Sequence, residues 1–137
     1  MRLRYVLPLA LLAALLAVSA AAGAIGGGNT PASIKTAGHA TLVDPADVAI
    51  NVTYSCLSAT GSSSIGSFGS VSIEEAGSPN PAFGFGQFMP ICDDSSHSTT
   101  VIVHGGPFTP GTGAAFAEVC GLTCASNGTA GQEITIR

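Results

Sequence analysis

The chain has 137 residues, of which 9% are charged, and it contains 18 Gly, no Trp and a formal net charge of −4. A chain of this length is expected to form one domain. Four Lys and Arg residues are too few to build the basic surface that binds a nucleic acid or an anionic membrane. The same shortage of reactive side chains argues against an enzyme.

Residues 1–24 have the composition of a secretory signal peptide. Arg2 and Arg4 precede an Ala/Leu run over residues 6–18, and small residues follow up to Ala24. We therefore expect cleavage after residue 24, secretion to the extracellular space and no membrane attachment afterwards. Residues 25–137 would keep two basic residues against eight acidic ones, a net charge of −6.

Residues 25–37 are rich in Gly and turn-forming residues and show no periodicity, so we expect a flexible leader there and a domain over residues 38–137. In this domain, short runs of β-branched and aromatic residues alternate with Gly, Ser, Pro and Asn. Strands are predicted at 39–43, 48–56, 69–75, 82–92, 99–104, 114–120 and 132–137. About seven short strands fit an all-β, immunoglobulin-like antiparallel sandwich better than a barrel.

Four Cys in a small exported chain are expected to form disulfides, for which three connectivities exist. We favour Cys56 with Cys92 and Cys120 with Cys124, because a Gly-containing turn separates the last two. The alternative is a metal site or a redox pair. Cysteine metal sites usually show a closer Cys spacing or neighbouring His residues, which this pattern lacks.

Asp93, Asp94 and His97 form the best candidate for a metal or acid–base site, since two carboxylates and an imidazole lie within five residues. Hard-cation loops need more oxygen ligands than this, and catalytic zinc needs three protein ligands. The simpler interpretation is a polar turn in which an Asp bonds its own backbone. His39, His97 and His104 are likewise expected to be solvated or at strand edges, and no nucleophile elbow is present.

The segment 83–89 is the candidate ligand surface. In a strand, Phe83, Phe85 and Met89 would share one face, and Phe88 would share the other with two glycines. Outward glycines would leave a shallow recess with Phe88 as its wall. Two interpretations remain: Phe83 and Phe85 fill the core, or part of the segment lines a binding surface. Phe108 is expected to plug a corner of the core.

The chain resembles a family of small exported β-sandwich domains from actinobacteria, which has no assigned function. The resemblance covers residues 48–120 and is carried by these residues: Val52, Tyr54, Cys56, Cys92, Asp93, Asp94, His97, Gly106, Pro107, Phe108, Pro110, Gly111, Ala115 and Ala117. A weaker similarity, at the level of the fold, links it to neocarzinostatin-type apoproteins, which are two-disulfide sandwiches that hold an enediyne. It is carried by Cys120, Cys124, Asn127, Gly128, Gly131 and the closing strand at 134–136. Fold similarity does not carry a ligand over.

Together these observations predict a secreted, non-enzymatic binding or interaction module without a cofactor, whose partner is an extracellular protein or a small apolar ligand. A carrier of a small apolar ligand, using residues 83–89, is the first alternative. A metal-dependent or hydrolytic enzyme centred on Asp93, Asp94 and His97 is the second.

Overall fold

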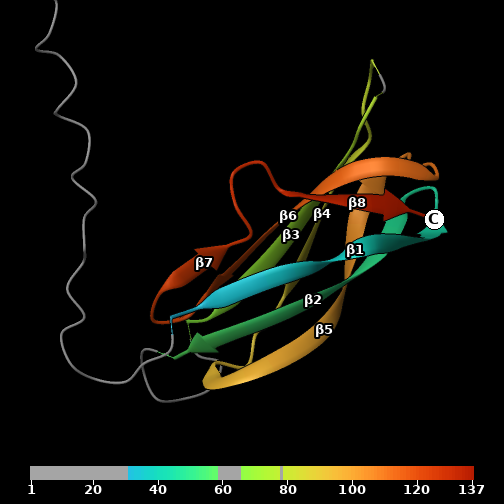
Figure 1. Cartoon of the computed structure of the whole chain (residues 1–137). Helices are drawn as coiled ribbons and strands as arrows, with labels where there is room; N and C mark the ends of the chain where they lie inside the picture. The colour runs from blue at the N-terminus through green and yellow to red at the C-terminus, as the bar shows by residue number, and fades with distance from the viewer. Residues whose placement is uncertain (1–30, 59–65, 78) are drawn as a thin grey trace, which may run out of the picture.

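The computed structural model describes residues 31–58, 66–77 and 79–137, which form eight β-strands wrapped around one core (Figure 1). The strands are β1 Ser33–Asp44, β2 Asp47–Leu57, β3 Phe68–Glu75, β4 Phe83–Phe88, β5 Asp93–Gly106, β6 Gly111–Cys120, β7 Cys124–Ser126 and β8 Gln132–Ile136. Among these residues no helix is long and apolar enough to cross a membrane. The predicted signal peptide, 1–24, lies outside the described residues.

The core is built from side chains that alternate along each strand, because successive residues of a strand point to opposite faces. In β2, for example, Ile50, Val52 and Tyr54 are buried, whereas Asn51 and Thr53 between them are exposed. The same alternation runs through β3, β6 and β8. The inward residues there are Val71, Ile73, Ala115, Ala117, Val119, Ile134 and Ile136.

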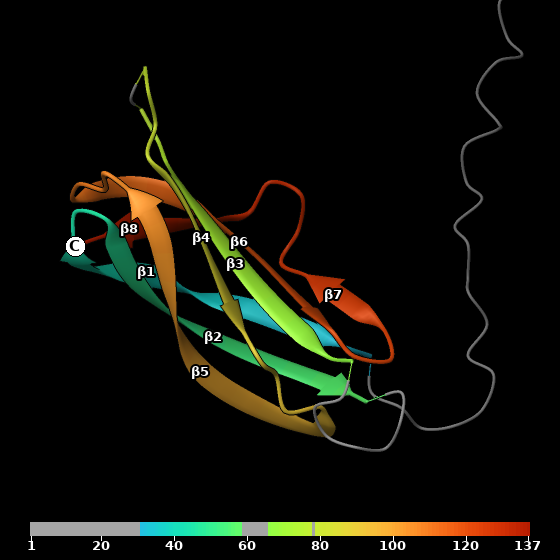
Figure 2. The same cartoon turned by 180° about the vertical axis from the view of Figure 1, so that it is seen from behind.

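The sheet closes on itself into a barrel of seven strands. The order is β3-β4-β5-β2-β1-β8-β6, and β6 pairs back to β3 along its length from Gly113 to Cys120. Figure 2 shows β3, β4 and β6 side by side on the face that is hidden in Figure 1. The short β7 pairs with β6 next to β8. All-β architecture with two disulfides is thus confirmed, but in place of two separate sheets there is one continuous one.

Two pairings account for this difference: β1 pairs with β8, and β4 pairs with β3 on one side and with β5 on the other. The inward positions of β4 are Gly84 and Gly86. A Cβ on Gly86 would lie 2.3 Å from the carbonyl oxygen of Ile102, so only glycine allows this close approach of β4 to β5. The two halves that would otherwise face each other as a sandwich are joined through β4 and through the β1–β8 pairing.

The predicted start of the domain was wrong by five residues. Residues 33–37, assigned to the flexible leader, belong to β1, where Ile34 and Thr36 are buried. They pair with the end of β2, from Ser33 opposite Ser55 to Thr36 opposite Val52. A Gly-rich segment precedes this strand in the sequence. The polar residues on the outer face of the strand resemble that segment in composition, so the sequence did not reveal where the strand begins.

Strands β1 and β8 pair over a short stretch, and nearby an asparagine side chain satisfies backbone groups of β6. β1 and β8 run parallel and pair at His39–Thr135 and Ala40–Ile136. Farther along, the side chain of Asn127 takes the place of a neighbouring strand. Its Oδ1 accepts from the Ala117 N–H at 2.9 Å and its Nδ2 donates to the Ala115 carbonyl at 2.8 Å. Asn127 thus satisfies β6 between the stretches paired to β7 and β8.

We expect Asn127→Ala to lower the free energy of unfolding by about 1–3 kcal/mol, because it leaves two part-buried backbone groups of β6 without partners. Urea denaturation measures this change. Thr129→Ala is the matched control, because Thr129 lies two residues away in the same loop and is exposed. Equal stability of the two variants would contradict the role assigned to Asn127.

Candidate binding surface

The four cysteines form the two favoured disulfides, Cys56–Cys92 and Cys120–Cys124. The first ties the end of β2 to the start of β5, and the second closes the β6–β7 turn. Glu118 lies near Cys120 and Cys124 in an arrangement with metal-ligand spacing. Because the two sulfurs are bonded to each other, they are not available as thiolate ligands.

Asp93 and His97 form a pair at one end of β5. Nε2 of His97 lies 2.7 Å from Oδ1 of Asp93, which also accepts the Ser95 N–H at 3.0 Å. The hydrogen bond from His97, followed by that from Ser95, holds the pKa of Asp93 below its ordinary value. The structure therefore contains the predicted Asp–backbone bond, set in a bulge of β5 rather than in a free turn.

Asp94 does not join this pair in a metal site. It sits in the bulge with a φ of 66°, and within residues 31–58, 66–77 and 79–137 the grouping with metal-ligand spacing does not include Asp93, Asp94 or His97. His104 makes a separate pair with Asp47, with 2.7 Å between Nδ1 and Oδ1. Both imidazoles thus have a carboxylate partner at the surface.

Strand β4 faces the opposite way to the predicted recess. Gly84 and Gly86 point into the barrel, where Phe108 and the valines of β5 fill the space that side chains would need. Phe83 and Phe85 point outward and are 57% and 46% exposed. The interpretation that these two phenylalanines fill the core is therefore wrong.

Phe88 was expected at the surface as the wall of the recess, and it packs inward instead. Its ring lies against Tyr54, with 5.2 Å between centroids, and covers Gly69 on the paired strand β3. Met89, one residue later, is 71% exposed. Of the four candidate ligand-surface residues, three are at the surface and Phe88 belongs to the core wall.

Five of the eight exposed large apolar side chains lie on one face of the barrel, which we call the apolar face: Phe68, Phe83, Phe85, Met89 and Ile102. They come from three neighbouring strands and the residue after β4. Phe85 lies opposite His104 of β5, two residues from Ile102, and Phe68 and Met89 flank the pair Gly69–Phe88. Exposed apolar side chains gathered on one face are a common feature of interaction surfaces.

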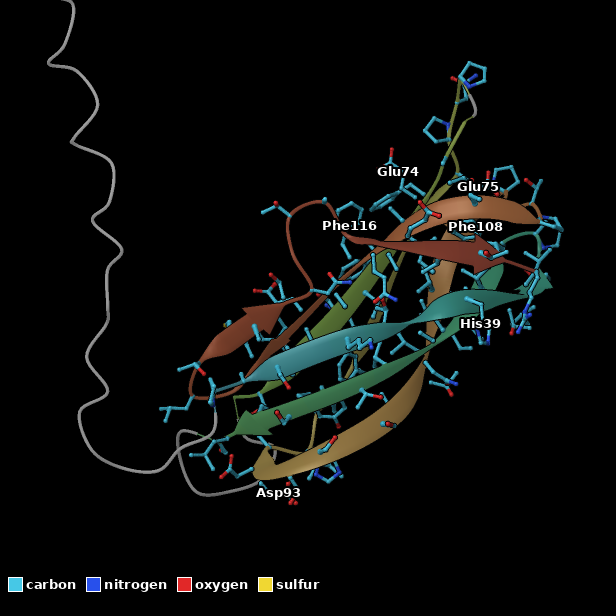
Figure 3. All side chains as sticks on the ribbon, in the orientation of Figure 1. His39, Glu74, Glu75, Asp93, Phe108 and Phe116 are labelled. Atoms are coloured by element: carbon cyan, nitrogen blue, oxygen red, sulfur yellow. A yellow bond between two sulfur atoms is a disulfide. The ribbon has the colours of Figure 1, made fainter. Side chains whose placement is uncertain are left out.

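Two shallow hollows adjoin the apolar face, over the paired strands β3 and β6. The glutamate hollow, about 480 Å³, is lined by Glu74, Glu133 and the small residues Gly113 and Ala114 between them. Figure 3 shows Glu74 at the base of the long β3–β4 hairpin.

The serine hollow, about 300 Å³, lies one step along the same strands and is lined by Ser70, Ser72, Phe116 and Glu118. The register places Phe85 directly beside Ser72 and Phe83 directly beside Glu74. Both hollows therefore open next to the phenylalanines of β4.

Phe68 and Phe116 were not singled out from the sequence. The signal for Phe68 was present, because it has the phase of Ser70 and Ser72, opposite to the buried Val71 and Ile73. Phe116 is half-buried on the outer side of β6 beneath Gly131, and its neighbours in sequence are alanines. Its exposure depends on how the β7–β8 loop folds back, which no local pattern reveals.

Comparison with known proteins identified no relative of this chain. The chain matches no protein-family model, no curated protein and no solved structure. The features of the structure that bear on function are the apolar face of the barrel and the two hollows beside it.

Proposed function

We propose that this protein is a secreted, non-enzymatic binding module that engages its partner through the apolar face. The observation that carries the proposal is the clustering of Phe83, Phe85 and Ile102 on adjacent strands, while the glycines of β4 face the core. Exposing two phenyl rings in preference to burying them costs hydrophobic free energy, which a binding role accounts for.

Export is supported by the two disulfides, which persist in oxidising compartments, and by the signal-peptide composition of residues 1–24. The acidic character of the chain fits a partner other than a nucleic acid.

An immunoglobulin-like origin of the fold is part of the proposal. The order β1-β2-β5-β4 on one side and β3-β6-β8 on the other corresponds to the two sheets of an immunoglobulin constant-type sandwich. The pairings β3–β4 and β1–β8 are additional to that plan and join the sheet edges. The extra β7 lies outside it.

A carrier of a small apolar ligand is the second candidate, and the hollows favour it. A volume of about 480 Å³ falls in the range of small-molecule sites. In this version of the proposal, the ligand lies over β3 and β6 and contacts Phe85 from the side. The apolar face then contacts one side of the ligand, and the hollows hold the rest of it.

The test uses N-phenylnaphthylamine, a neutral fluorescent probe of apolar surface, titrated into the intact secreted protein. Phe85→Ser should weaken probe binding by about tenfold, the lower end of what burying one Phe side chain contributes. Because Phe85 is half-exposed, the free energy of unfolding should change by no more than about 0.5 kcal/mol.

Val43→Ser is the control, since Val43 is also an exposed apolar residue but lies on β1, away from the apolar face. It should leave the affinity for the probe unchanged. The proposal fails if Phe85→Ser and Val43→Ser bind the probe as the unmodified protein does.

A further inference from the structure

We infer that the occupant of the apolar face and the adjoining hollows is a small organic cation, with an apolar body and an ammonium-type group. This inference rests on the proposed function and adds the chemical class of the ligand. It combines the position of the phenylalanines, the size of the hollows and the charge around them.

The apolar face and the hollows lie on neighbouring strands of the outer surface, and the strand register brings residues of the two next to each other. On the outer side of the barrel, Phe116 of β6 lies opposite Ser72 of β3, and Ser72 lies opposite Phe85 of β4. A small residue thus lies between two phenyl side chains. One step along the strands, Ala114 and Glu74 lie opposite each other, and Glu74 lies beside Phe83. A compact ligand seated over Ser72 and Ala114 contacts aromatic carbon and a carboxylate together.

The charge around the hollows is negative. Glu74 and Glu133 line the glutamate hollow and Glu118 lines the serine hollow. The carboxylate of Glu75, also at the glutamate hollow, is already engaged by the N–H and hydroxyl of Thr109. In the described part of the chain the basic residues are Lys35 on β1 and Arg137 after β8, and neither lines a hollow. A ligand cation supplies the complementary charge that the described residues do not.

The same charges argue against a second copy of the chain as the occupant. An interface between two apolar faces would include Glu74, which lies beside Phe83, from both copies of an acidic chain, and like charges brought together are unfavourable. A cation over a phenyl ring is attracted by the ring quadrupole, which adds to the attraction of the carboxylates. The apolar face and its negative surroundings therefore favour one ligand that satisfies both.

The experiment compares three naphthyl compounds that share one apolar body: naphthylmethylammonium, naphthylmethanol and naphthoate. Each is titrated into the intact protein at low salt, and backbone amide shifts are followed by NMR. We expect the cation to bind about fivefold more tightly than the neutral alcohol, and the anion to bind most weakly. The preference should fall towards one in about 0.5 M salt, because the charges are at the surface.

The double variant Glu74→Gln/Glu133→Gln should bring the cation to within about twofold of the alcohol, without changing the affinity for the alcohol. Asp94→Asn is the control, because it removes a carboxylate at the far end of β5, where Asn also tolerates the positive φ. It should keep the full preference for the cation.

The outcomes separate this inference from the proposed function. If the alcohol binds, Phe85→Ser weakens it and no preference for the cation exists, the ligand class is wrong and the binding role stands. If the preference for the cation over the alcohol survives in the double glutamine variant, Glu74 and Glu133 are not the carboxylates that attract the cation. If a Lys-rich peptide shifts the same amides more strongly than the small cation does, the occupant is a protein segment and the inference is overturned.

Discussion

Replacing both partners of the long disulfide, Cys56→Ala with Cys92→Ala, is expected to lower the free energy of unfolding by about 3.8 kcal/mol. The bond joins residues 36 apart in sequence, and the loss of chain entropy that it imposes on the unfolded state grows with that separation. The melting temperature should fall by about 15 °C. Thermal denaturation followed by circular dichroism measures this, with urea denaturation as a second method.

The Cys120–Cys124 bond provides the comparison, because it closes a loop with a separation of 4. Cys120→Ala with Cys124→Ala should cost about 2 kcal/mol, roughly half as much. The order of the two effects is the decisive result. A larger loss from the short bond would show that native-state contacts around the β6–β7 turn outweigh the constraint on the unfolded chain.

Phe108→Ala is expected to cost about 3–5 kcal/mol, the range for removing a fully buried phenyl ring. Phe108 is 2% exposed, and its ring tip lies 2.6 Å from where a Cβ on Gly84 would be. The ring therefore occupies the volume that β4 leaves empty by carrying glycine. Its backbone N–H also bonds the Pro45 carbonyl at 2.7 Å, so the segment is held in place and cannot easily collapse into the cavity.

Urea denaturation measures this loss as a lower midpoint with an unchanged slope. Phe83→Ala is the control, because it removes the same ring from the exposed side of β4. It should change stability by no more than about 0.5 kcal/mol. Similar losses for Phe83→Ala and Phe108→Ala would contradict the assignment of inside and outside at β4.

Strand β2 and strand β5 mark what the sequence does and does not predict. β2 alternates apolar and polar residues without interruption, so its position and its buried face could both be predicted. The first half of β5 carries Asp, Ser, His and Thr, and we predicted a turn there. It is a strand because its backbone pairs with β2 as far as Ser96 opposite Ser55, and an outer side chain follows this register: Ser98 bonds Thr53 at 2.9 Å. Such cross-strand pairs depend on a partner distant in sequence.

The residues of β4 show the same contrast between what the sequence predicts and what depends on tertiary packing. Alternation predicts which residues of β4 share a face, and it correctly separates Phe83 and Phe85 from the two glycines. It does not say which face is inside. That choice depends on Phe108, more than twenty residues later, and on the close approach of β5 at Gly86. The alternation along a strand therefore predicts which of its residues share a face, whereas tertiary packing decides which of the two faces is buried.

The glycine-lined inner side of β4 separates the requirements of recognition from those of folding. The inner positions Gly84 and Gly86 must be glycine because a Cβ there would meet Phe108 or β5, whereas the outward residues Phe83, Phe85 and Gln87 are exposed and can be exchanged without disturbing interior packing. Most barrel strands carry both tasks, so that changing one face risks the other. In this protein the outer face of β4 is free to vary in sequence, while Phe108, on another segment, fills the interior beside Gly84.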